Sequence, residues 1–383
     1  MTQLGQKTGP LRGLKVVELA GIGPGPHACM ILADLGADVI RIDRPRGASI
    51  GGGSKDLLNR GRPSVALDLK NPKAVETVLQ LVEEADAFIE GMRPGVTERL
   101  GLGPEDCAKR NPKLVYGRMT GWGQDGPWAH AAGHDMNYIA ITGALYGLGQ
   151  DKARPHFPMN LVGDFGGGST YLVIGILAAI FEAQRSGQGQ VVDAAIVDGT
   201  AHLNAMGSAF AVSGLQGQER LSGLLDGGTP YYDIYETADG EHMSVGALEP
   251  QFYDVLVDKL GIADTAPDRY DPANFSALKQ LLTDTFKSKT QAEWSQIFDG
   301  TDACVAPILP IAKAPEHPHM AARQVFVEAD AMVQPAPAPR FSRTAPTLTT
   351  PPATAGQHTR EALQAWGIDP EPLISEGVAV QAE

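Results

Sequence analysis

Residues 15–26 read KVVELAGIGPGP, and this stretch decides the expected fold. Its first five residues, three of them apolar, read as a buried β-strand, and a glycine and proline turn follows. Helical periodicity follows from Pro26 to Ala37, and a second strand is expected over residues 38–42. The order of strand, helix and strand predicts a β-α-β unit.

A second unit of the same kind begins at Asn71-Pro72, where an N-cap residue precedes a proline at the first helical position. Apolar side chains then recur on one helical face, at Val75, Val78, Leu79 and Val82. A strand is expected over residues 87–90, and a core helix over residues 171–185 precedes another strand at 191–195. The repeated alternation predicts a parallel, doubly wound sheet in the N-terminal half.

The C-terminal half has a different pattern. Residues 231–245 alternate between apolar and polar like antiparallel strands, and residues 250–294 carry helical segments. Together they predict a second, smaller α+β domain. Residues 308–352 are rich in proline and alanine, which suits an extended crossing segment, and residues 359–366 are again helical.

The composition limits the classes of function. The chain has 383 residues and is 43 % apolar, which is enough for two domains with ordinary cores. A formal net charge of −14 opposes binding to nucleic acid or to an anionic membrane. No apolar run approaches the roughly 18 residues of a membrane span, and the N-terminus lacks a signal-peptide pattern, so a cytoplasmic protein is expected.

The turn before the first helix occupies the place of the phosphate loop in a dinucleotide fold, and Asp43 closes the second strand, so a nicotinamide site is one alternative. However, the glycines fall as G-x-G-x-G, and Pro24 and Pro26 remove amide donors that a pyrophosphate needs. Arginines near strand ends and turns favour another anionic ligand, because guanidinium groups suit phosphate. They are Arg41, Arg44, Arg46, Arg60, Arg62, Arg93 and Arg99.

Glycines and ionisable residues concentrate in three segments, residues 133–138, 162–168 and 246–250. An imidazole and a carboxyl group in apolar surroundings can both titrate near neutral pH, so His134 and Asp164 are candidates for an acid/base pair. The alternative is that His134 only caps a turn and that Asp164 only starts the following helix.

Metal and serine chemistry fit the sequence less well. His130 and His134 are spaced like zinc ligands, but Gly133 lies between them and no glutamate follows His130. Three cysteines far apart indicate neither a disulfide framework nor a zinc ribbon, and no G-x-S-x-G elbow occurs. We therefore expect no metal site.

Several segments taken together resemble the family III CoA-transferase superfamily, and within it the α-methylacyl-CoA racemases. They occur in order over nearly the whole chain, from about Pro10 to Leu363, and such long agreement is more specific than one glycine loop. The segments are VVELAGIGPGP at 16–26, ADLGADVIRIDRP at 33–45, EGMRPG at 90–95, MTGWGQ at 119–124 and the three ionisable segments above.

The resemblance implies an α/β fold with a Rossmann-like, doubly wound large domain, a small α+β domain and an interlocked homodimer. It places the active site between the large domain of one subunit and the small domain of the other, which allows Glu249 to act in trans. The implied boundaries are the first part of the CoA-binding large domain at 1–193, a linker at 194–222, the small domain at 223–317, a return linker at 318–342, and a segment at 343–383 that completes the large domain.

The resemblance also implies the site residues. His134 and Asp164 match the two acid/base groups, Glu249 matches a carboxylate that orients the histidine, and the backbone amide of Asp135 is placed to meet the thioester oxygen. The implied contacts with coenzyme A are Arg44, Leu67, Asp68, Leu69, Lys70, Gly91, Met92, Arg93, Arg99, Gly133, Met136, Asn137 and Tyr138.

The implied activity is racemisation or epimerisation of 2-methyl-branched acyl-CoA thioesters, by 1,1-proton transfer through an enolate and without a cofactor. Acyl-CoA is then the small-molecule partner, and neither nucleic acid nor membrane is a partner. The main alternative is a CoA transferase of the same fold, in which Asp164 is the nucleophile of an acyl-enzyme. His134 favours the racemase, because a nucleophilic carboxylate needs no imidazole across the substrate. A non-catalytic CoA-thioester binding protein is a further alternative, and the preferred acyl chain stays open.

Overall fold

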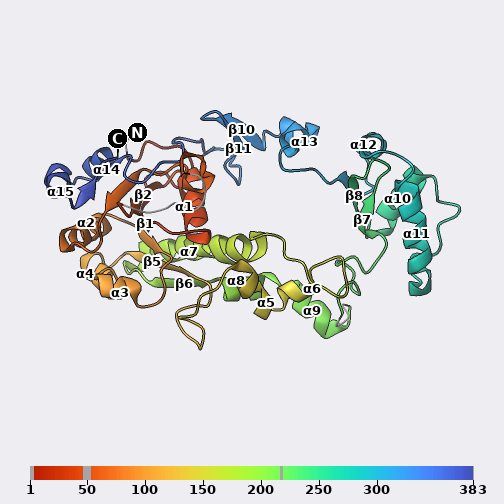
Figure 1. Ribbon diagram of the computed structural model, residues 1–383, viewed down its shortest axis with the longest axis horizontal. Helices are drawn as coiled ribbons and strands as arrows, with labels where there is room; N and C mark the ends of the chain where they lie inside the picture. Colours follow the sequence, from red (N-terminus) through yellow and green to blue (C-terminus); the bar gives the residue numbers. More distant parts are fainter. Residues whose placement is uncertain (1–3, 46–52, 216–218, 383) are drawn as a thin grey trace. The chain divides into compact units, whose positions relative to one another are not determined.

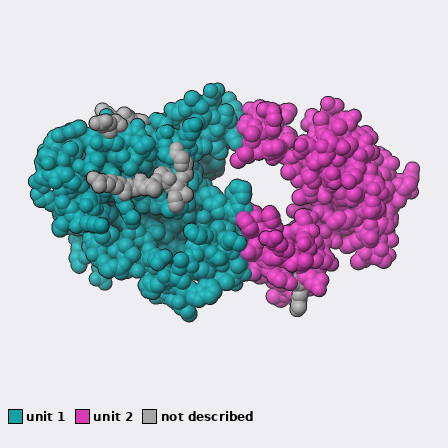
Figure 2. Space-filling model, viewed as in Figure 1, with its two compact units in different colours: residues 1–142, 159–203, 323–383 teal, residues 143–158, 204–322 magenta. Residues whose placement is uncertain are grey.

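The computed structural model describes residues 4–45, 53–215 and 219–382. Contacts within the chain divide it into two compact units (Figure 2). The larger unit contains Met1–Thr142, Met159–Leu203 and Arg323–Glu383, and the smaller unit contains Gly143–Pro158 and Asn204–Ala322. Residues from both ends of the chain therefore belong to the larger unit. The first ten residues of the expected first linker, 194–203, group with the larger unit.

A seven-stranded sheet forms the centre of the larger unit, with the order β12-β3-β2-β1-β4-β5-β6 among the described residues. Figure 1 labels β1, β2, β5 and β6 of this sheet. Neighbouring strands from β3 to β6 pair in parallel, and β12 adds an antiparallel edge from the C-terminal segment. The predicted large parallel sheet is therefore confirmed. Its strands are β1 (Lys15–Leu19), β2 (Asp38–Asp43), β3 (Ser64–Leu67), β4 (Ala87–Glu90), β5 (Val115–Thr120), β6 (Val191–Ala195) and β12 (Ala379–Val380).

The order of the strands reverses at β1. The chain adds β2 and β3 on one side of β1 and then crosses over to add β4, β5 and β6 on the other side. Val16 consequently has Val39 of β2 as one neighbour and Ala87 of β4 as the other. In open parallel sheets the carboxyl ends of the two strands at such a switch point border a crevice that holds ligands. The turns after β1 and β4 are therefore where a site is expected.

Alternating strand residues feed two cores, one on each face of the sheet. Val17 and its neighbours pack against α2 (Pro72–Glu83), α4 (Pro104–Arg110) and α14 (Thr359–Ala365). Val16 and its neighbours pack against α1 (Pro24–Asp34) and α7 (Thr170–Ser186). Each fully buried Val, Leu, Ile or Phe contributes about 1.5 to 3 kcal/mol. The second core therefore holds α1 and α7 against the sheet, and α7 continues from the helical turns that carry Asp164.

Shorter elements complete the larger unit. They are η1 (Gly53–Lys55), η2 (Leu57–Asn59), α3 (Val96–Leu100), α5 (Asp135–Ile141), α8 (Ile196–Leu203), α15 (Glu371–Ser375) and the hairpin of β10 (Phe326–Ala329) and β11 (Met332–Pro335).

A continuous helical stretch runs from Leu161 to Ser186, and its first part is a π-helix, η3 (Leu161–Ser169), that continues into α7. By length and composition alone this stretch could cross a membrane, although no uninterrupted apolar run of that length occurs in the sequence. This is weak evidence for a membrane span, because the core helix of a globular protein meets the same criteria. Leu172 and Ile176 of α7 are fully buried in the core of the sheet.

The smaller unit has its own sheet and core. Its strands β7 (Tyr232–Glu236), β8 (His242–Gly246) and β9 (Val305–Pro307) pair antiparallel in that order. Trp294, Phe286 and Tyr235 are among the largest buried side chains and pack together. The helices are α6 (Ala144–Gly147), α9 (Ala205–Ser213), α10 (Pro250–Leu260), η4 (Pro272–Asn274), α11 (Phe275–Phe286), α12 (Gln291–Phe298), η5 (Ala314–Glu316) and α13 (Pro318–Ala322).

Candidate functional site

A cavity of about 350 Å³ lies in the larger unit at the switch point of the sheet. Its wall is formed by the carboxyl ends of β1, β4 and β5, by the turn before α1, by the loop before α5, and by η3. His134 and Asp164 both line it, although they come from different elements. The structure therefore brings the two candidate acid/base residues to one cavity.

His134 is the residue that immediately precedes α5, and its backbone is extended. Its N–H donates to Oδ1 of Asn137 at 3.0 Å, and its carbonyl accepts from the N–H of Asn137 at 2.8 Å. The backbone is thus held by the first turn of the helix, while the imidazole is exposed in the single chain and borders the cavity. His134 therefore both caps the start of a helix and lies at the cavity, so the structural role and the proposed acid/base role are compatible.

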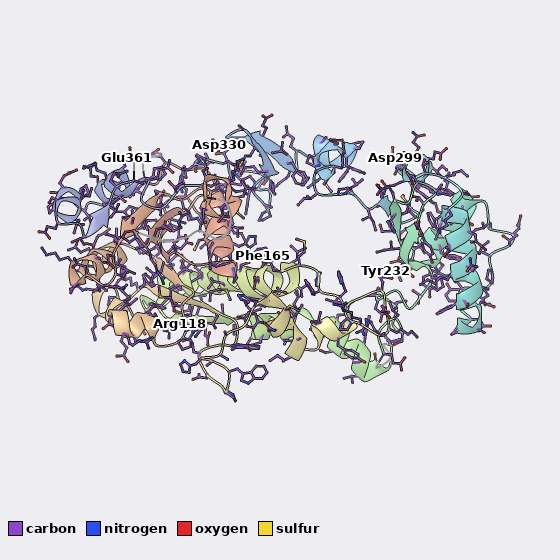
Figure 3. The ribbon with its side chains drawn as sticks, in the orientation of Figure 1. Arg118, Phe165, Tyr232, Asp299, Asp330 and Glu361 are labelled. Atoms are coloured by element: carbon purple, nitrogen blue, oxygen red, sulfur yellow. The ribbon has the colours of Figure 1, made fainter. Side chains whose placement is uncertain are left out.

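Asp164 lies in the first turn of the π-helix η3, one residue before Phe165, which Figure 3 labels. Glycines allow this helix to approach α8 closely: a Cβ added to Gly167 would lie 2.3 Å from Oγ1 of Thr200, and one added to Gly199 would lie 1.8 Å from the carbonyl oxygen of Gly167. π-helical turns of this kind are frequent at functional sites.

The carboxyl group of Asp164 is half-buried, and desolvation raises its pKa. The nearby charge of Asp135 adds to the increase in pKa, whereas a hydrogen bond from Asn160 and the charge of His134 oppose it. The bond joins Nδ2 of Asn160 to Oδ2 of Asp164 at 3.1 Å. A raised pKa lets this group be present as the neutral acid nearer to neutral pH, as a general acid requires.

Tyr138 forms part of the cavity wall beneath the His134 turn. Its hydroxyl donates to the carbonyl of Gly133, and its ring meets Trp122 edge-on at 4.7 Å. Gly121 has to lack a side chain here, because a Cβ would stand 2.0 Å from the tyrosine ring. Burial raises the pKa of the Tyr138 hydroxyl, so it stays protonated and keeps this hydrogen bond.

A second and larger cavity of about 980 Å³ adjoins the first. Both are lined by the glycine turn at 21–23 and by the turn of Gly91, Met92 and Arg93. The second cavity adds Arg41 and Arg44, together with residues 353–355 of the C-terminal segment. The turn after β4 is fixed by Glu90, whose carboxylate accepts from the N–H of Met92 at 2.6 Å and from Nε of Arg118 at 3.1 Å. The exposed arginines Arg44 and Arg93 therefore border a cavity that shares two turns of its wall with the acid/base cavity.

The model of CoA-transferase family III matches residues 11–359 of the chain. This protein belongs to CoA-transferase family III. It is 44% identical over 368 residues to the α-methylacyl-CoA racemase of Mus musculus and 42% identical over 369 residues to that of Homo sapiens, with 95% of each chain covered in both cases. It is also 30% identical to the acetyl-CoA:oxalate CoA-transferase of Acetobacter aceti, over 85% of this chain and 88% of that protein.

Solved structures of the family agree with the fold. A CAIB/BAIF family protein from Brucella suis matches with a TM-score of 0.80 and 27% identity, covering 94% of this chain and 100% of the other. Rv3272 from Mycobacterium tuberculosis, in its orthorhombic form, matches with a TM-score of 0.76 and 27% identity over 92% of this chain and 99% of that one. The α/β architecture is thus that of CoA-transferase family III.

Other residues that the family resemblance proposes for coenzyme A lie outside both cavities. Leu67 is fully buried in β3 and packs in the core. Neither cavity is lined by Asp68, Leu69, Lys70, Arg99, Met136 or Asn137. Glu249 lies in the smaller unit, where it precedes α10 and is exposed. Their proposed roles stay predictions.

Three arginines expected near an anionic ligand have internal partners in this family III fold, and the first of them, Arg41, is buried and paired with Asp43 at 2.8 Å. Arg60 is paired with Asp34 at 2.5 Å, and Arg62 is fully buried and paired with Glu18 at 2.6 Å. Their guanidinium groups hold the loop before β3 to α1 and β1. Arg46 lies outside the described residues.

Among the described residues, no group of three or more His, Cys, Asp and Glu side chains is placed to hold a metal ion.

Two residues of the site, Asn160 and Glu90, were not predicted from the sequence. The signal for Asn160 was its position four residues before Asp164, a spacing that brings helical side chains together.

Proposed function

We propose that this chain interconverts the two hands of a 2-methyl-branched acyl-CoA thioester by moving one proton at the α-carbon. The observation that carries the proposal is the shared cavity lined by His134 and Asp164. The proposal is supported by the family and by the names of relatives with 44% and 42% identity, which are α-methylacyl-CoA racemases.

The first chemical requirement is stabilisation of the enolate. The α-hydrogen of a thioester is a much weaker acid than any side chain, and each unmatched pKa unit costs about 1.4 kcal/mol. The N–H of Asp135 is at the first position of α5, where helix amides have no partner within the helix. Such an amide, aimed at the thioester oxygen, contributes about 3 to 4 kcal/mol to the transition state.

The second requirement is delivery of a proton to the face opposite its removal. In one direction neutral His134 removes the α-proton and protonated Asp164 donates a proton to the other face. In the reverse direction the Asp164 carboxylate removes the proton and the imidazolium donates one. The enzyme thus holds one proton shared between the two groups, and the raised pKa of Asp164 favours this sharing.

We place coenzyme A in the larger cavity. Arg44 and Arg93 line it and offer guanidinium groups for phosphate oxygens. The shared turn at residues 91–93 then lies between the nucleotide end and the thioester end of the substrate. No cofactor is required in this scheme, because the thioester itself stabilises the carbanion.

We also propose a homodimer in which Glu249 orients His134. Support for the dimer comes from large apolar side chains that the single chain leaves exposed, such as Ile174 (56%) and Phe181 (62%) on α7. We further propose that the protein is cytoplasmic and that it has neither nucleic acid nor a membrane as a partner, since a net charge of −14 opposes binding to either.

A CoA transferase is the second candidate, because the Acetobacter aceti relative is one and Asp164 faces the cavity. In that reaction the Asp164 carboxylate attacks the thioester, forms a mixed anhydride and releases coenzyme A. The imidazole of His134 on the same cavity favours the racemase, since the transferase has no need of a second acid/base group.

The test is incubation of the protein with one hand of a 2-methylacyl-CoA in deuterated water. The racemase predicts deuterium at the α-carbon together with loss of optical activity. Trapping of an acyl-enzyme by hydroxylamine, with exchange of coenzyme A onto a free acid and no α-deuteration, would establish the transferase instead.

A further inference from the structure

We propose that the side-chain carboxylate of Asp135 is a positioning group that fixes Asp164 relative to His134. This inference rests on the proposed function, because it assigns a purpose to the placement of Asp164. It is separate from the role expected for the backbone amide of Asp135, which concerns the thioester oxygen.

The central contact is a hydrogen bond between two separate elements. Oδ2 of Asp135, at the start of α5, accepts from the backbone N–H of Asp164 in η3 at 2.7 Å. Asp135 is buried, with 6% of its surface exposed, although it carries a charge. Charged side chains are rarely buried this far unless they are paired. Oδ2 has a specific partner in the backbone of the π-helix, whereas Oδ1 is buried and has no hydrogen-bond partner among the described residues.

The position of Asp164 in its helix explains why the bond is needed. Asp164 is in the first turn of η3, where N–H groups have no carbonyl partner within the helix. A carboxylate that accepts from these groups acts as a cap supplied by a different element. The amide of Gly163 also points toward the Asp135 carboxylate. The Asp135 carboxylate therefore fixes the backbone of η3 at Asp164, the residue that carries the catalytic carboxyl group.

The backbone of η3 packs closely against Asp135 around this hydrogen bond. A Cβ on Gly163 would lie 2.4 Å from Oδ2 of Asp135 and 2.9 Å from Cγ2 of Ile139. The glycine thus lets the backbone of η3 lie directly against the carboxylate. Asp135 also follows His134 in the chain, so a single residue joins the turn that carries the imidazole to the turn that carries the carboxyl group.

The bond matters for chemistry because two groups on opposite faces of one enolate need a fixed separation. Displacement of a catalytic group by about 1 Å can lower the rate on the order of 100-fold. If Asp135 fixes only Asp164, its loss impairs proton transfer on the Asp164 face and leaves the His134 face competent. The consequence is an asymmetry between the two hands of the substrate, which a general loss of stability does not produce.

The experiment compares α-hydrogen exchange in deuterated water with inversion, for each hand of a 2-methylacyl-CoA. The test variant is Asp135→Ala. The matched control is Asp369→Ala, which removes a carboxylate that accepts a backbone N–H at 3.1 Å on the surface of the same unit. For Asp135→Ala we expect the ratio of exchange to inversion to rise about tenfold or more for the hand whose α-hydrogen faces His134, with exchange of the other hand lowered similarly. The control should keep the wild-type ratio.

A second variant keeps the test decisive if Asp135→Ala does not fold. Asp135→Asn retains an oxygen acceptor for the Asp164 amide but removes the charge. We expect its exchange ratio to stay near the wild-type value. The acid limb of its pH–rate profile should move to lower pH, because the charge of Asp135 raises the pKa of Asp164. His134 and Tyr138 are the other titratable groups at this carboxyl group, and neither is changed.

Equal loss of exchange for both hands in Asp135→Ala, or an unchanged pH profile in Asp135→Asn, would overturn the inference. Failure of the proposed function looks different. In that case the wild-type protein itself shows neither α-deuteration nor inversion, whichever residue occupies position 135.

Discussion

Gly167→Ala is the substitution that most directly tests whether close packing of η3 against α8 sets the position of Asp164. The added Cβ would lie 2.3 Å from Oγ1, 2.6 Å from N and 2.9 Å from Cα of Thr200. Two of these atoms belong to the backbone of α8 and cannot rotate away. The helices have to separate by about 1 Å to restore ordinary contacts.

The energetic consequence can be estimated from two opposing effects. Overpacking of this kind costs about 1 to 3 kcal/mol, and rigid backbone neighbours place this site at the upper end. Replacement of glycine by alanine within a helix recovers about 0.5 to 1 kcal/mol. We therefore expect the free energy of unfolding to fall by about 2 kcal/mol, with inversion lowered on the order of 100-fold through the shift of Asp164.

Chemical denaturation and a polarimetric racemisation assay measure these two effects. Gly168→Ala is the matched control, because its Cβ would first meet the flexible Cγ1 of Ile196 at 3.0 Å. It should have a smaller effect on both stability and inversion. Unchanged inversion in a folded Gly167→Ala protein would show that the packing of η3 does not determine the site geometry.

Three further predictions concern binding, titration and stability. Arg93→Ala should weaken binding of coenzyme A, measured by calorimetry, about tenfold or more, since a charge-assisted contact contributes about 1.5 to 3 kcal/mol. The control Arg110→Ala should leave this binding unchanged, because the Arg110 guanidinium pairs with surface glutamates. The hydrogen bond from Asn160 lowers the pKa of Asp164, so Asn160→Ala should move the acid limb of the pH–rate profile to higher pH, and a shift to lower pH would refute this assignment. Arg269→Met should lower the free energy of unfolding, measured by chemical denaturation, by about 2 to 4 kcal/mol. The reason is that the buried guanidinium donates to the carbonyls of Ala247 and Leu248 at 3.0 and 2.8 Å and stacks on tyrosine rings. A loss below about 0.5 kcal/mol would contradict this prediction.

The parallel sheet could be predicted from residues 15–43, because two short segments rich in Val, Leu and Ile, residue types that favour strands, flank a segment with helical periodicity. β5 could not, since Gly117 and Arg118 interrupt its pattern. The structure explains the glycine: a Cβ there would lie 2.7 Å from Cδ1 of Ile176 in α7. The edge strand β12 has only two residues, and its pairing with β3 depends on contacts between distant parts of the chain.

His134 and Asp164 could be proposed from the sequence because ionisable groups among glycines and apolar residues are costly without a partner or a function. Their common cavity depends on how α5 and η3 pack, which no local pattern encodes. Contacts between distant parts of the chain also determine which arginines are free to bind a ligand. Arg60 and Arg62 resemble phosphate ligands in the sequence, but their partners Asp34 and Glu18 lie far away along the chain and satisfy them internally.

We propose that His134 and Asp164 protonate one enolate from opposite faces. This proposal is tested most directly by α-hydrogen exchange of each pure hand of a 2-methylacyl-CoA in deuterated water, with His134→Ala and Asp164→Asn. Both variants should lose inversion by about 100-fold or more, as expected for a lost general acid/base group. Asp164→Asn should still exchange only one hand, and His134→Ala only the other. Exchange of the same hand by both variants would place the two groups on one face and contradict the account.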